Sequence, residues 1–371
     1  MPPSELADWL RLTLVPGVGS MAQRQLLASY GLPSQIFTSS LGQLAIIIGE
    51  PLARALLSHD SRETIAATLT WLEQEGNHLI TLADAEYPPL LLEIADPPTL
   101  LYVKGKPELL LQPSLAIVGS RNATAQGLRD TEAFANSLAQ AGLTIVSGLA
   151  LGIDAAAHQG ALAAQGNTVA IVGTGADRIY PARNKALALA IAEHGAIVSE
   201  FPLGTPAIAY NFPRRNRLIA GLSRGCLVVE AAPASGSLIT ARLAGEQGRE
   251  VMAIPGSIHS PMSRGCHQLI KQGAKLVETA QDVLEELGRL PGLLTAQTPP
   301  PSPSANAELF SENEEGDEGR LLNALGHTPC DSDTLALRSG LTTDVLCAIL
   351  TTLELAGKIA CLPGGRYQRL D

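Results

Sequence analysis

The sequence predicts an α/β protein built on an open, doubly wound and mostly parallel sheet, flanked by two smaller domains. Three observations predict this class. Short β-branched runs alternate with alanine-rich helical stretches between about residues 114 and 280. Residues 1–75 show helical patterning alone. A segment rich in proline, serine and acidic residues then separates the middle of the chain from a short helical region at its C-terminal end.

Six runs of strand length define the predicted sheet: Ser114–Val118, Thr144–Ser147, Thr168–Val172, Ala196–Ser199, Cys226–Glu230 and Glu250–Ile254. Helical stretches lie between them, at 124–141, 153–165, 184–194, 213–222 and 237–247. Strands that alternate with helices form parallel sheets covered on both faces. A closed eightfold barrel needs more units than these. We therefore predict the open arrangement, which is Rossmann-like.

The two flanks have their own patterns. The N-terminal helices enclose the turn Val15-Pro-Gly-Val-Gly19. After the linker, three helices are predicted near 319–326, 331–338 and 342–357, followed by two strands around Pro363-Gly364-Gly365, which is turn chemistry. Three helices and a two-stranded wing are the winged-helix pattern. The predicted domains are 1–75, helical; 76–290, Rossmann-like; 291–318, a linker; and 319–371, a winged helix.

Composition and charge narrow the classes of function. Hydrophobic residues make up 46% of the 371, so the chain can bury a large core and is not disordered as a whole. The net charge of −10 argues against a uniformly basic nucleic-acid binder. The charge is unevenly distributed, however, because residues 114–280 carry 14 basic and 10 acidic side chains while both flanks are acidic. A local anion site in the middle of the chain is therefore compatible with the total.

Cysteine usage and hydropathy predict the compartment. The five cysteines include no C-x-x-C pair, which excludes a disulfide framework or a thiolate zinc knuckle. Asp154 with His158, and His259 with Cys266 and His267, lack further ligands at suitable spacing, so we predict no metal. The first residues contain no apolar signal core, and the longest apolar runs are too short to span a bilayer. We expect a cytoplasmic protein without a membrane segment.

Small or polar residues follow the first three predicted strands. The first ends in Gly119-Ser120-Arg121 and the second in Ser147-Gly148. In an open parallel sheet ligands bind beyond the carboxyl ends of the strands, where helix N-termini offer free N–H groups and an arginine can clasp a phosphate. An ordinary strand-to-helix turn with a surface arginine would give the same pattern at the first strand.

The third strand end excludes one ligand class. Gly173-Thr174-Gly175 begins like the dinucleotide fingerprint G-x-G-x-x-G, but Arg178 stands where the last glycine belongs. The first strand end lacks the fingerprint as well. We therefore predict no dinucleotide cofactor, and we expect no other.

The most basic stretch is Asn211-Phe212-Pro213-Arg214-Arg215-Asn216-Arg217 at a predicted helix start. Cations at the positive end of a helix are unfavourable unless an anion is bound there, and an aromatic side chain beside them suits stacking on unpaired bases. A solvated helix start with Phe212 in the core is the alternative. Hydroxyls in Ser235-Gly236-Ser237 and Thr240 stand at another helix start, where simple capping would also explain them.

No nucleophile–base pair and no acidic dyad accompanies these motifs. They predict an extended phosphate-binding edge better than a catalytic pocket. The candidate DNA- or phosphate-binding residues are Gly119, Ser120, Arg121, Ser147, Gly148, Gly173, Gly175, Lys185, Asn211, Phe212, Arg214, Arg215, Asn216, Arg217, Ser235, Gly236, Ser237 and Thr240.

The same residues, in this order, resemble the DNA-processing protein A family (DprA, also called Smf) between Ala116 and Val277. The motifs are Val118-Gly-Ser-Arg121, Ser147-Gly-Leu-Ala-Leu-Gly-Ile-Asp154, Gly173-Thr-Gly175, Tyr180-Pro181 with Asn184, Glu200 with Asn211–Arg217, Ser235-Gly-Ser-Leu-Ile-Thr240 and Gly265-Cys-His-Gln-Leu-Ile270. The flanks resemble a helix-hairpin-helix or SAM-like domain and the family's winged helix.

The resemblance implies an extended Rossmann fold that binds single-stranded DNA without catalysis. It implies loading of the RecA recombinase onto incoming strands during natural transformation. It assigns DNA contacts to Arg121 and to Asn211–Arg217, with Lys185 a looser correspondence. It also implies a homodimer formed near Leu269 and Ile270. The predicted recognition helix of the winged helix, 342–357, carries no Lys or Arg, so there we expect a protein contact or a regulatory role.

Two other functions stay open from the residues. A nucleotide phosphoribohydrolase on a related Rossmann-like fold carries Pro-Gly-Gly-x-Gly-Thr-x-x-Glu, whereas the comparable stretch here, residues 231–240, has no glutamate after its threonine. A protein adaptor could instead use the basic rim to bind an acidic partner. Release of a base from nucleoside monophosphates would identify the enzyme, and competition between an oligonucleotide and a partner would identify the adaptor.

Overall fold

The computed structural model describes residues 2–288, 317–326 and 329–370. Its N-terminal part is helical: α1 (Pro3–Leu14), α2 (Ser20–Tyr30), α3 (Pro33–Thr38), α4 (Leu41–Ile48), α5 (Glu50–Ser58) and α6 (Arg62–Leu72). These helices pack around their own core, which includes Leu12, Leu26 and Leu44. Gly17 has a φ of 85°, so a glycine suits the turn between α1 and α2.

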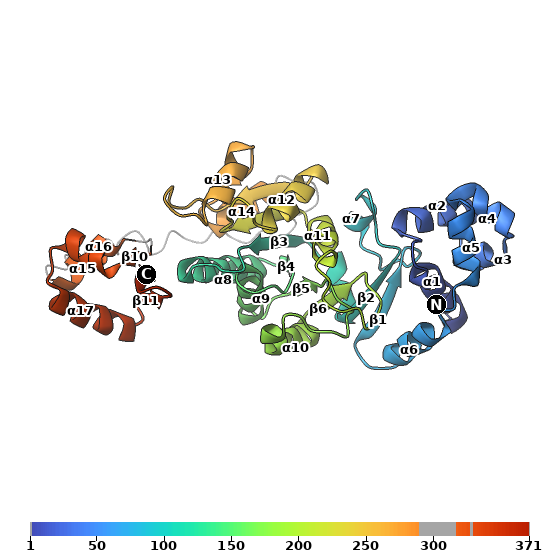
Figure 1. The fold of residues 1–371 in the computed structure, drawn as a ribbon, viewed down its shortest axis with the longest axis horizontal. Coiled ribbons are helices and arrows are strands. Elements are labelled where there is room, and N and C mark those ends of the chain that lie inside the picture. Colours follow the sequence, from blue (N-terminus) through green and yellow to red (C-terminus); the bar gives the residue numbers. More distant parts are fainter. Residues whose placement is uncertain (1, 289–316, 327–328, 371) are drawn as a thin grey trace.

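A nine-stranded sheet forms the centre of the molecule (Figure 1). Its strands are β1 (Asn77–Thr81), β2 (Leu100–Gly105), β3 (Ser114–Gly119), β4 (Thr144–Ser147), β5 (Thr168–Ile171), β6 (Ala196–Ser199), β7 (Gly225–Val229), β8 (Glu250–Ala253) and β9 (Lys275–Leu276). Their order is β1-β2-β6-β5-β4-β3-β7-β8-β9. The neighbours from β6 to β9 pair in parallel, while β1 with β2 and β2 with β6 pair antiparallel. The predicted mostly parallel α/β sheet is confirmed.

Helices cover both faces of this sheet because alternate strand residues point to opposite sides. On β3, Leu115 and Ile117 pack in one cluster with residues of α8 (Ala125–Gln140), α9 (Ile153–Ala163) and α14 (Ala280–Gly288). Ala116 and Val118 belong to the other cluster, with α7 (Pro89–Leu92), α11 (Asn211–Leu222), α12 (Ser237–Glu246) and α13 (Arg264–Lys271). α10 (Lys185–His194) packs its Ala188 and Ile191 against Ala170 of β5. Both faces of the sheet are therefore buried, as its apolar strands require.

Three strands of this sheet, and the packing of the N-terminal helices against its edge, were not predicted from the sequence. β1 and β2 form an antiparallel edge beyond the strand–helix alternation, and β9 has two residues. The N-terminal helices also share a core with this edge, since Trp9, Leu10 and Trp71 cluster with Leu100 and Tyr102. The rings of Trp71 and Tyr102 meet edge to face with centroids 6.2 Å apart.

The C-terminal part is a winged helix, as predicted. It contains α15 (Asp317–Leu325), β10 (Cys330–Asp331), α16 (Ser332–Ser339), α17 (Thr343–Leu355), β11 (Ile359–Leu362) and β12 (Arg366–Arg369). The sheet order β10-β12-β11 adds one short strand to the two predicted ones. Gly364 and Gly365, both at positive φ, form the turn of the wing. The predicted linker, 291–318, lies almost wholly outside the described residues.

In the described part of the chain, no single helix has the length and apolarity to cross a membrane. Helices α16 and α17, bent by 110° relative to each other, meet the length and composition criteria only as a pair.

Candidate nucleic-acid interface

A groove with a volume of about 720 Å³ opens where the chain reverses its direction across the sheet. β3 lies between β4 and β7, so the connections after β3 and β7 diverge and leave a crevice at their carboxyl ends. Ten of the predicted site residues line it: Gly119, Ser120, Arg121, Phe212, Arg215, Asn216, Ser235, Gly236, Ser237 and Thr240. The structure thus brings together residues that lie far apart in the sequence.

The Gly-Ser-Arg motif after β3 contributes one exposed cation. A Cβ on Gly119 would stand 1.9 Å from the Val229 carbonyl oxygen of β7, so the glycine is required by the neighbouring strand. The buried Ser120 donates its backbone N–H to the Glu230 carbonyl over 2.7 Å. Arg121 is exposed, with its guanidinium carbon 5.9 Å from the centre of the Phe212 ring. Of this motif, Arg121 alone presents a charge to the groove.

Arg215 lies beneath the groove and is only 4% exposed. Its guanidinium donates hydrogen bonds to the carbonyl oxygens of Gly148 and Ile171, at the ends of β4 and β5. Burial lowers the pKa of Arg215 to about 10, with nearby Asp154 opposing the shift. Gly148 lacks a side chain where one would collide with this guanidinium, 2.1 Å from Nη1. Sequence reasoning treats Arg215 as a DNA contact, whereas the structure uses it to hold two strand ends together.

Asp154 completes this arrangement. Its carboxylate accepts the backbone N–H of Gly148 at 3.1 Å and that of Ala150 at 3.4 Å. Burial raises the pKa of Asp154, and the positive charge of Arg215 opposes that rise. The carboxylate therefore fixes the loop after β4 in place.

Four further predicted residues pack the rim without lining the groove. Ser147 is fully buried and donates its hydroxyl to the Ile117 carbonyl at 2.6 Å. Gly173 leaves room for Phe212, whose Cδ1 would lie 3.0 Å from a Cβ there. Gly175 lies under the loop at Pro202, whose carbonyl oxygen would be 2.8 Å from its Cβ. Asn211 donates its amide to the Gly173 carbonyl at 3.1 Å. These four residues support the residues that line the groove and do not line it themselves.

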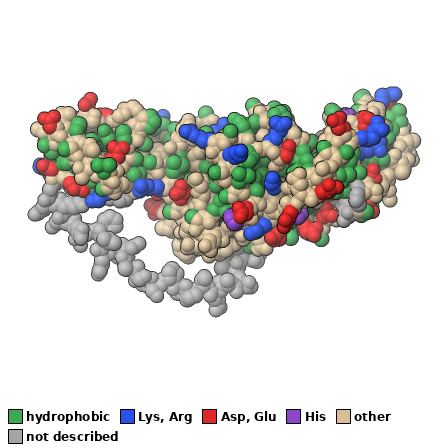
Figure 2. Space-filling view, turned by 90° about the horizontal axis from the view of Figure 1, so that it is seen from below, with side chains coloured by type: hydrophobic (Ala, Val, Ile, Leu, Met, Phe, Trp, Pro, Cys, Tyr) green, Lys and Arg blue, Asp and Glu red, His purple; other side chains and the backbone are tan. Residues whose placement is uncertain are grey.

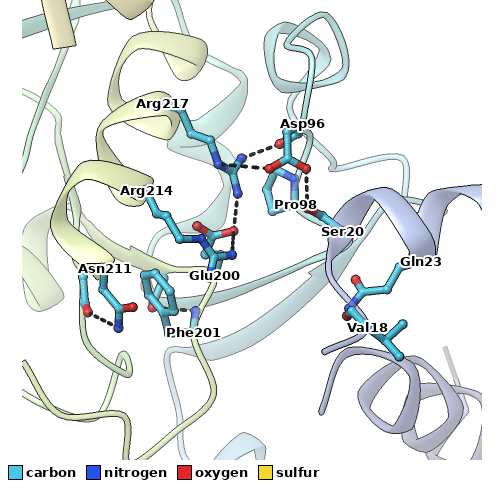
Figure 3. Close-up of polar contacts among 12 residues, drawn as sticks. Val18, Ser20, Gln23, Asp96, Pro98, Glu200, Phe201, Asn211, Arg214 and Arg217 are labelled. Atoms are coloured by element: carbon cyan, nitrogen blue, oxygen red, sulfur yellow. Dashed lines mark hydrogen bonds and ion pairs between the residues drawn. The ribbon is translucent and has the colours of Figure 1, made fainter. Parts of the chain in front are cut away.

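The remaining two arginines of the basic stretch face the N-terminal helices (Figure 3). Arg217, 11% exposed, pairs with the buried Glu200 and, through Nε at 3.6 Å, with Asp96. Arg214 reaches the same Glu200 oxygen at 3.7 Å. Burial raises the pKa of Glu200, and the two arginines oppose that rise. Ser20 at the start of α2 donates its hydroxyl to Asp96, which links α2 to this cluster.

An aromatic pair forms one wall of the groove. The rings of Tyr180 and Phe212 have centroids 5.6 Å apart and are tilted by 39°. Tyr180 is 49% exposed, while Phe212 is half-buried. Tyr180 was absent from the predicted site residues. Its one sequence signal was the Tyr-Pro pair that follows the third strand end.

The start of α12 also lines the groove. The hydroxyl oxygens of Ser235 and Ser237 lie 2.7 Å apart, and Ser235 Oγ accepts the Ser237 N–H at 3.3 Å. Gly236 is exposed and has open space around it, and its carbonyl accepts the Asn216 amide at 3.4 Å. Ser235 thus accepts the N–H of the first helical residue, and both serines line the groove.

Three predicted residues lie elsewhere. Lys185 is exposed in the first turn of α10 and does not line the groove. Leu269 is 9% exposed on α13, where Ile270 packs beside it against the sheet core. Leu269 also lines a separate cavity of about 670 Å³ between α12 and α13.

Basic and acidic side chains are mixed over the face shown in Figure 2. Several Lys and Arg side chains lie over its central part, and both signs of charge are present there and towards the two ends. Among residues 2–288, 317–326 and 329–370, no group of three His, Cys, Asp or Glu side chains is placed to hold a metal ion.

Fold and groove together define a Rossmann-like α/β protein with a cationic and aromatic groove at its switch point and a winged helix at its C-terminal end. The family model described as DNA recombination-mediator protein A matches residues 78–288, and the DprA winged helix domain matches residues 296–365. The chain therefore belongs to the DNA recombination-mediator protein A family, DprA or Smf, as its motifs predicted.

Named relatives and solved structures agree. Protein Smf of Escherichia coli (strain K12) is 46% identical over 314 residues, covering 83% of this chain and 82% of the relative. DNA processing protein A from Streptococcus pneumoniae superposes with a TM-score of 0.66 at 39% identity, covering 77% of this chain and 98% of that one. DNA processing protein A from Helicobacter pylori superposes with a TM-score of 0.52 at 32% identity, covering 57% of this chain and 96% of that one. Its structure was described as giving insight into that protein's single-stranded DNA binding mode.

Proposed function

We propose that this protein binds single-stranded DNA in the groove at the switch point and loads RecA recombinase onto the bound strand during natural transformation. The observation that carries the proposal is the pairing of an exposed cation, Arg121, with the aromatic wall of Tyr180 and Phe212 in one groove. Single strands expose both phosphates and unpaired base faces, and such a groove offers a partner for each. The Helicobacter pylori relative supports this assignment.

Replacing Arg121 by alanine tests the groove. We expect binding to a thymidine oligonucleotide to weaken about tenfold and the slope of log affinity against log salt to fall by roughly one, because one phosphate contact is lost. Fluorescence anisotropy at several salt concentrations measures both. The matched control is Lys106→Ala, which removes an exposed cation that lies outside the groove and is not among the candidate DNA contacts. Normal binding and slope in Arg121→Ala would place the strand elsewhere.

RecA loading needs its own measurement. The parent protein should speed the formation of RecA filaments on a single strand already covered by single-strand-binding protein. Arg121→Ala should lose this stimulation in proportion to its lost DNA affinity. Stimulation that survives without DNA binding would separate the two halves of the proposal.

We also propose that the protein acts without catalysis, in the cytoplasm and as a homodimer formed through α13 near Leu269 and Ile270. The residue after Thr240 is alanine, and the phosphoribohydrolase glutamate is missing from that helix start. Incubation with nucleoside monophosphates should release no base. Sedimentation equilibrium should give twice the 38.7 kDa mass of the chain.

A further inference from the structure

The geometry points to Tyr180 as the platform on which a base of the bound strand stacks, with Phe212 beneath it as the support. This inference rests on the proposed function and names the residue that contacts the bases. It assigns stacking to a tyrosine from a different part of the chain, and not to Phe212, for which the sequence leaves stacking and a place in the core both open.

Exposure separates the two rings. Phe212 belongs to the first turn of α11, and its ring lies against the backbone of Gly173, where a Cβ would come within 3.0 Å of Cδ1 and 3.3 Å of Cε1. One side of Phe212 is therefore occupied by protein. Tyr180 follows β5, packs on Phe212 with ring centroids 5.6 Å apart, is 49% exposed and lines the groove. A base can reach Tyr180 more readily than Phe212.

The cations are arranged around this pair. The guanidinium carbons of Arg121 and Arg215 both lie 5.9 Å from the Phe212 ring centre. Arg215 is buried and engaged with backbone carbonyls, so it holds Phe212 in place but cannot follow a ligand. Arg121 is exposed and free to engage a phosphate of the nucleotide whose base lies on Tyr180. Base and phosphate would thus be bound by separate side chains.

Two alanines that line the groove also suit the flat face of a base. Ala207 and Ala209, on the exposed loop before α11, line the same groove as Tyr180. They offer methyl groups and no side-chain hydrogen-bond donor or acceptor. Contacts of this kind accept any base, because every base has a π-face. The wall therefore predicts recognition of bases as a class and little sequence preference.

Comparing a normal strand with an abasic one isolates the base contact. The probes are a fluorescent thymidine oligonucleotide and an abasic oligonucleotide of equal length and charge. The parent should prefer the thymidine strand, and Tyr180→Ala should bind it about tenfold more weakly while binding the abasic strand unchanged. Tyr180→Phe should restore the preference. Arg121→Ala should weaken both probes, since both carry phosphates.

Tyr210 provides a matched control. It is 72% exposed, sits just before α11, and is not among the residues that line the groove. Tyr210→Ala should keep the preference for the thymidine strand. Equal losses from Tyr180→Ala and Tyr210→Ala would overturn the assignment to the groove.

A crosslinking experiment tests the parent protein directly. A strand with 5-iodouracil at one position should, on irradiation, become attached to the peptide that contains Tyr180. Attachment to peptides remote from the groove would contradict the inference even if Tyr180→Ala proved unstable.

The outcomes separate the inference from the proposed function. If the parent binds neither probe, the proposed function fails. If it binds thymidine and abasic strands equally well, single-stranded DNA binding stands and stacking on Tyr180 fails.

Discussion

Replacing Arg215 by alanine is expected to lower the free energy of unfolding by about 3 kcal/mol, because two buried carbonyl oxygens lose their donor and a buried carboxylate loses a nearby positive charge. Asp154 would lose the nearby positive charge, and the carbonyl oxygens of Gly148 and Ile171 would lose their donor. Chemical denaturation at pH 7 measures the change. DNA binding should fail as well, since the loops after β4 and β5 lose their common anchor.

Arg121→Ala is the matched comparison, because both residues belong to the same groove and both are arginines. Removing the exposed Arg121 should weaken DNA binding while leaving the unfolding free energy within about 0.5 kcal/mol of the parent. An Arg215→Ala variant as stable as Arg121→Ala would show that the buried guanidinium has no structural role.

Acid should destabilise the protein through His158, a buried residue of α9. Its Nδ1 lies 2.7 Å from Thr168 Oγ1, which itself donates to the Ile145 carbonyl, so Nδ1 carries the proton. Nε2 has no hydrogen-bond partner among the described residues. Burial lowers the pKa of His158 to about 3, with Arg215 contributing. The imidazole is therefore neutral in the folded protein at every pH near neutrality.

The sign of the pH dependence follows from this shift. Below about pH 6.5 His158 binds a proton in the unfolded chain but not in the folded protein. The free energy of unfolding therefore decreases as the pH is lowered, until the folded pKa near 3 is reached. The expected loss from this residue between pH 7 and pH 5 is about 2 kcal/mol. Urea unfolding at both values measures it.

A substitution isolates the histidine from other titrating groups. Asp154 and Glu200, whose pKa values are raised by burial, act in the opposite direction and stay present in both proteins. His158→Asn keeps a donor toward Thr168 but cannot be protonated, so it should lose about 2 kcal/mol of the pH dependence. Parallel pH profiles for the two proteins would contradict the neutral buried state.

The parallel core of the fold could be predicted from the sequence because each strand and each helix has its own local pattern. Runs such as Val169–Ile171 are apolar at every position, so both faces of the strand are apolar, which a sheet covered by helices demands. The edge strands could not be predicted in the same way. Asn77–Thr81 and Leu100–Gly105 flank a proline-rich stretch and pair antiparallel, and the helix between them, α7, has only four residues. The shared core of Trp71 and Tyr102 depends on tertiary contact alone.

The location of the site was predictable, but the orientation of its side chains was not. Strand ends in an open sheet fix where Gly119, Ser147 and Gly173 must lie. They do not fix which arginine of Arg214, Arg215 and Arg217 points outward. Successive helical residues face different directions, so one is buried under the rim and two turn toward Glu200. In the structure the exposed arginine of the groove is Arg121. From the sequence alone, Arg121 could not be distinguished in this respect from the three arginines of the basic stretch.

The central position of β3 has a consequence for the order of folding. Leu115 pairs with Ile145 on one side, a near neighbour in the chain, and with Gly225 on the other, much further along. Closing the longer loop costs more entropy before its contacts repay it, so β3 should join β7 late. The groove takes residues from both sides of this junction. DNA binding should therefore recover only in the last phase of refolding, and it would report when the two halves of the sheet have met.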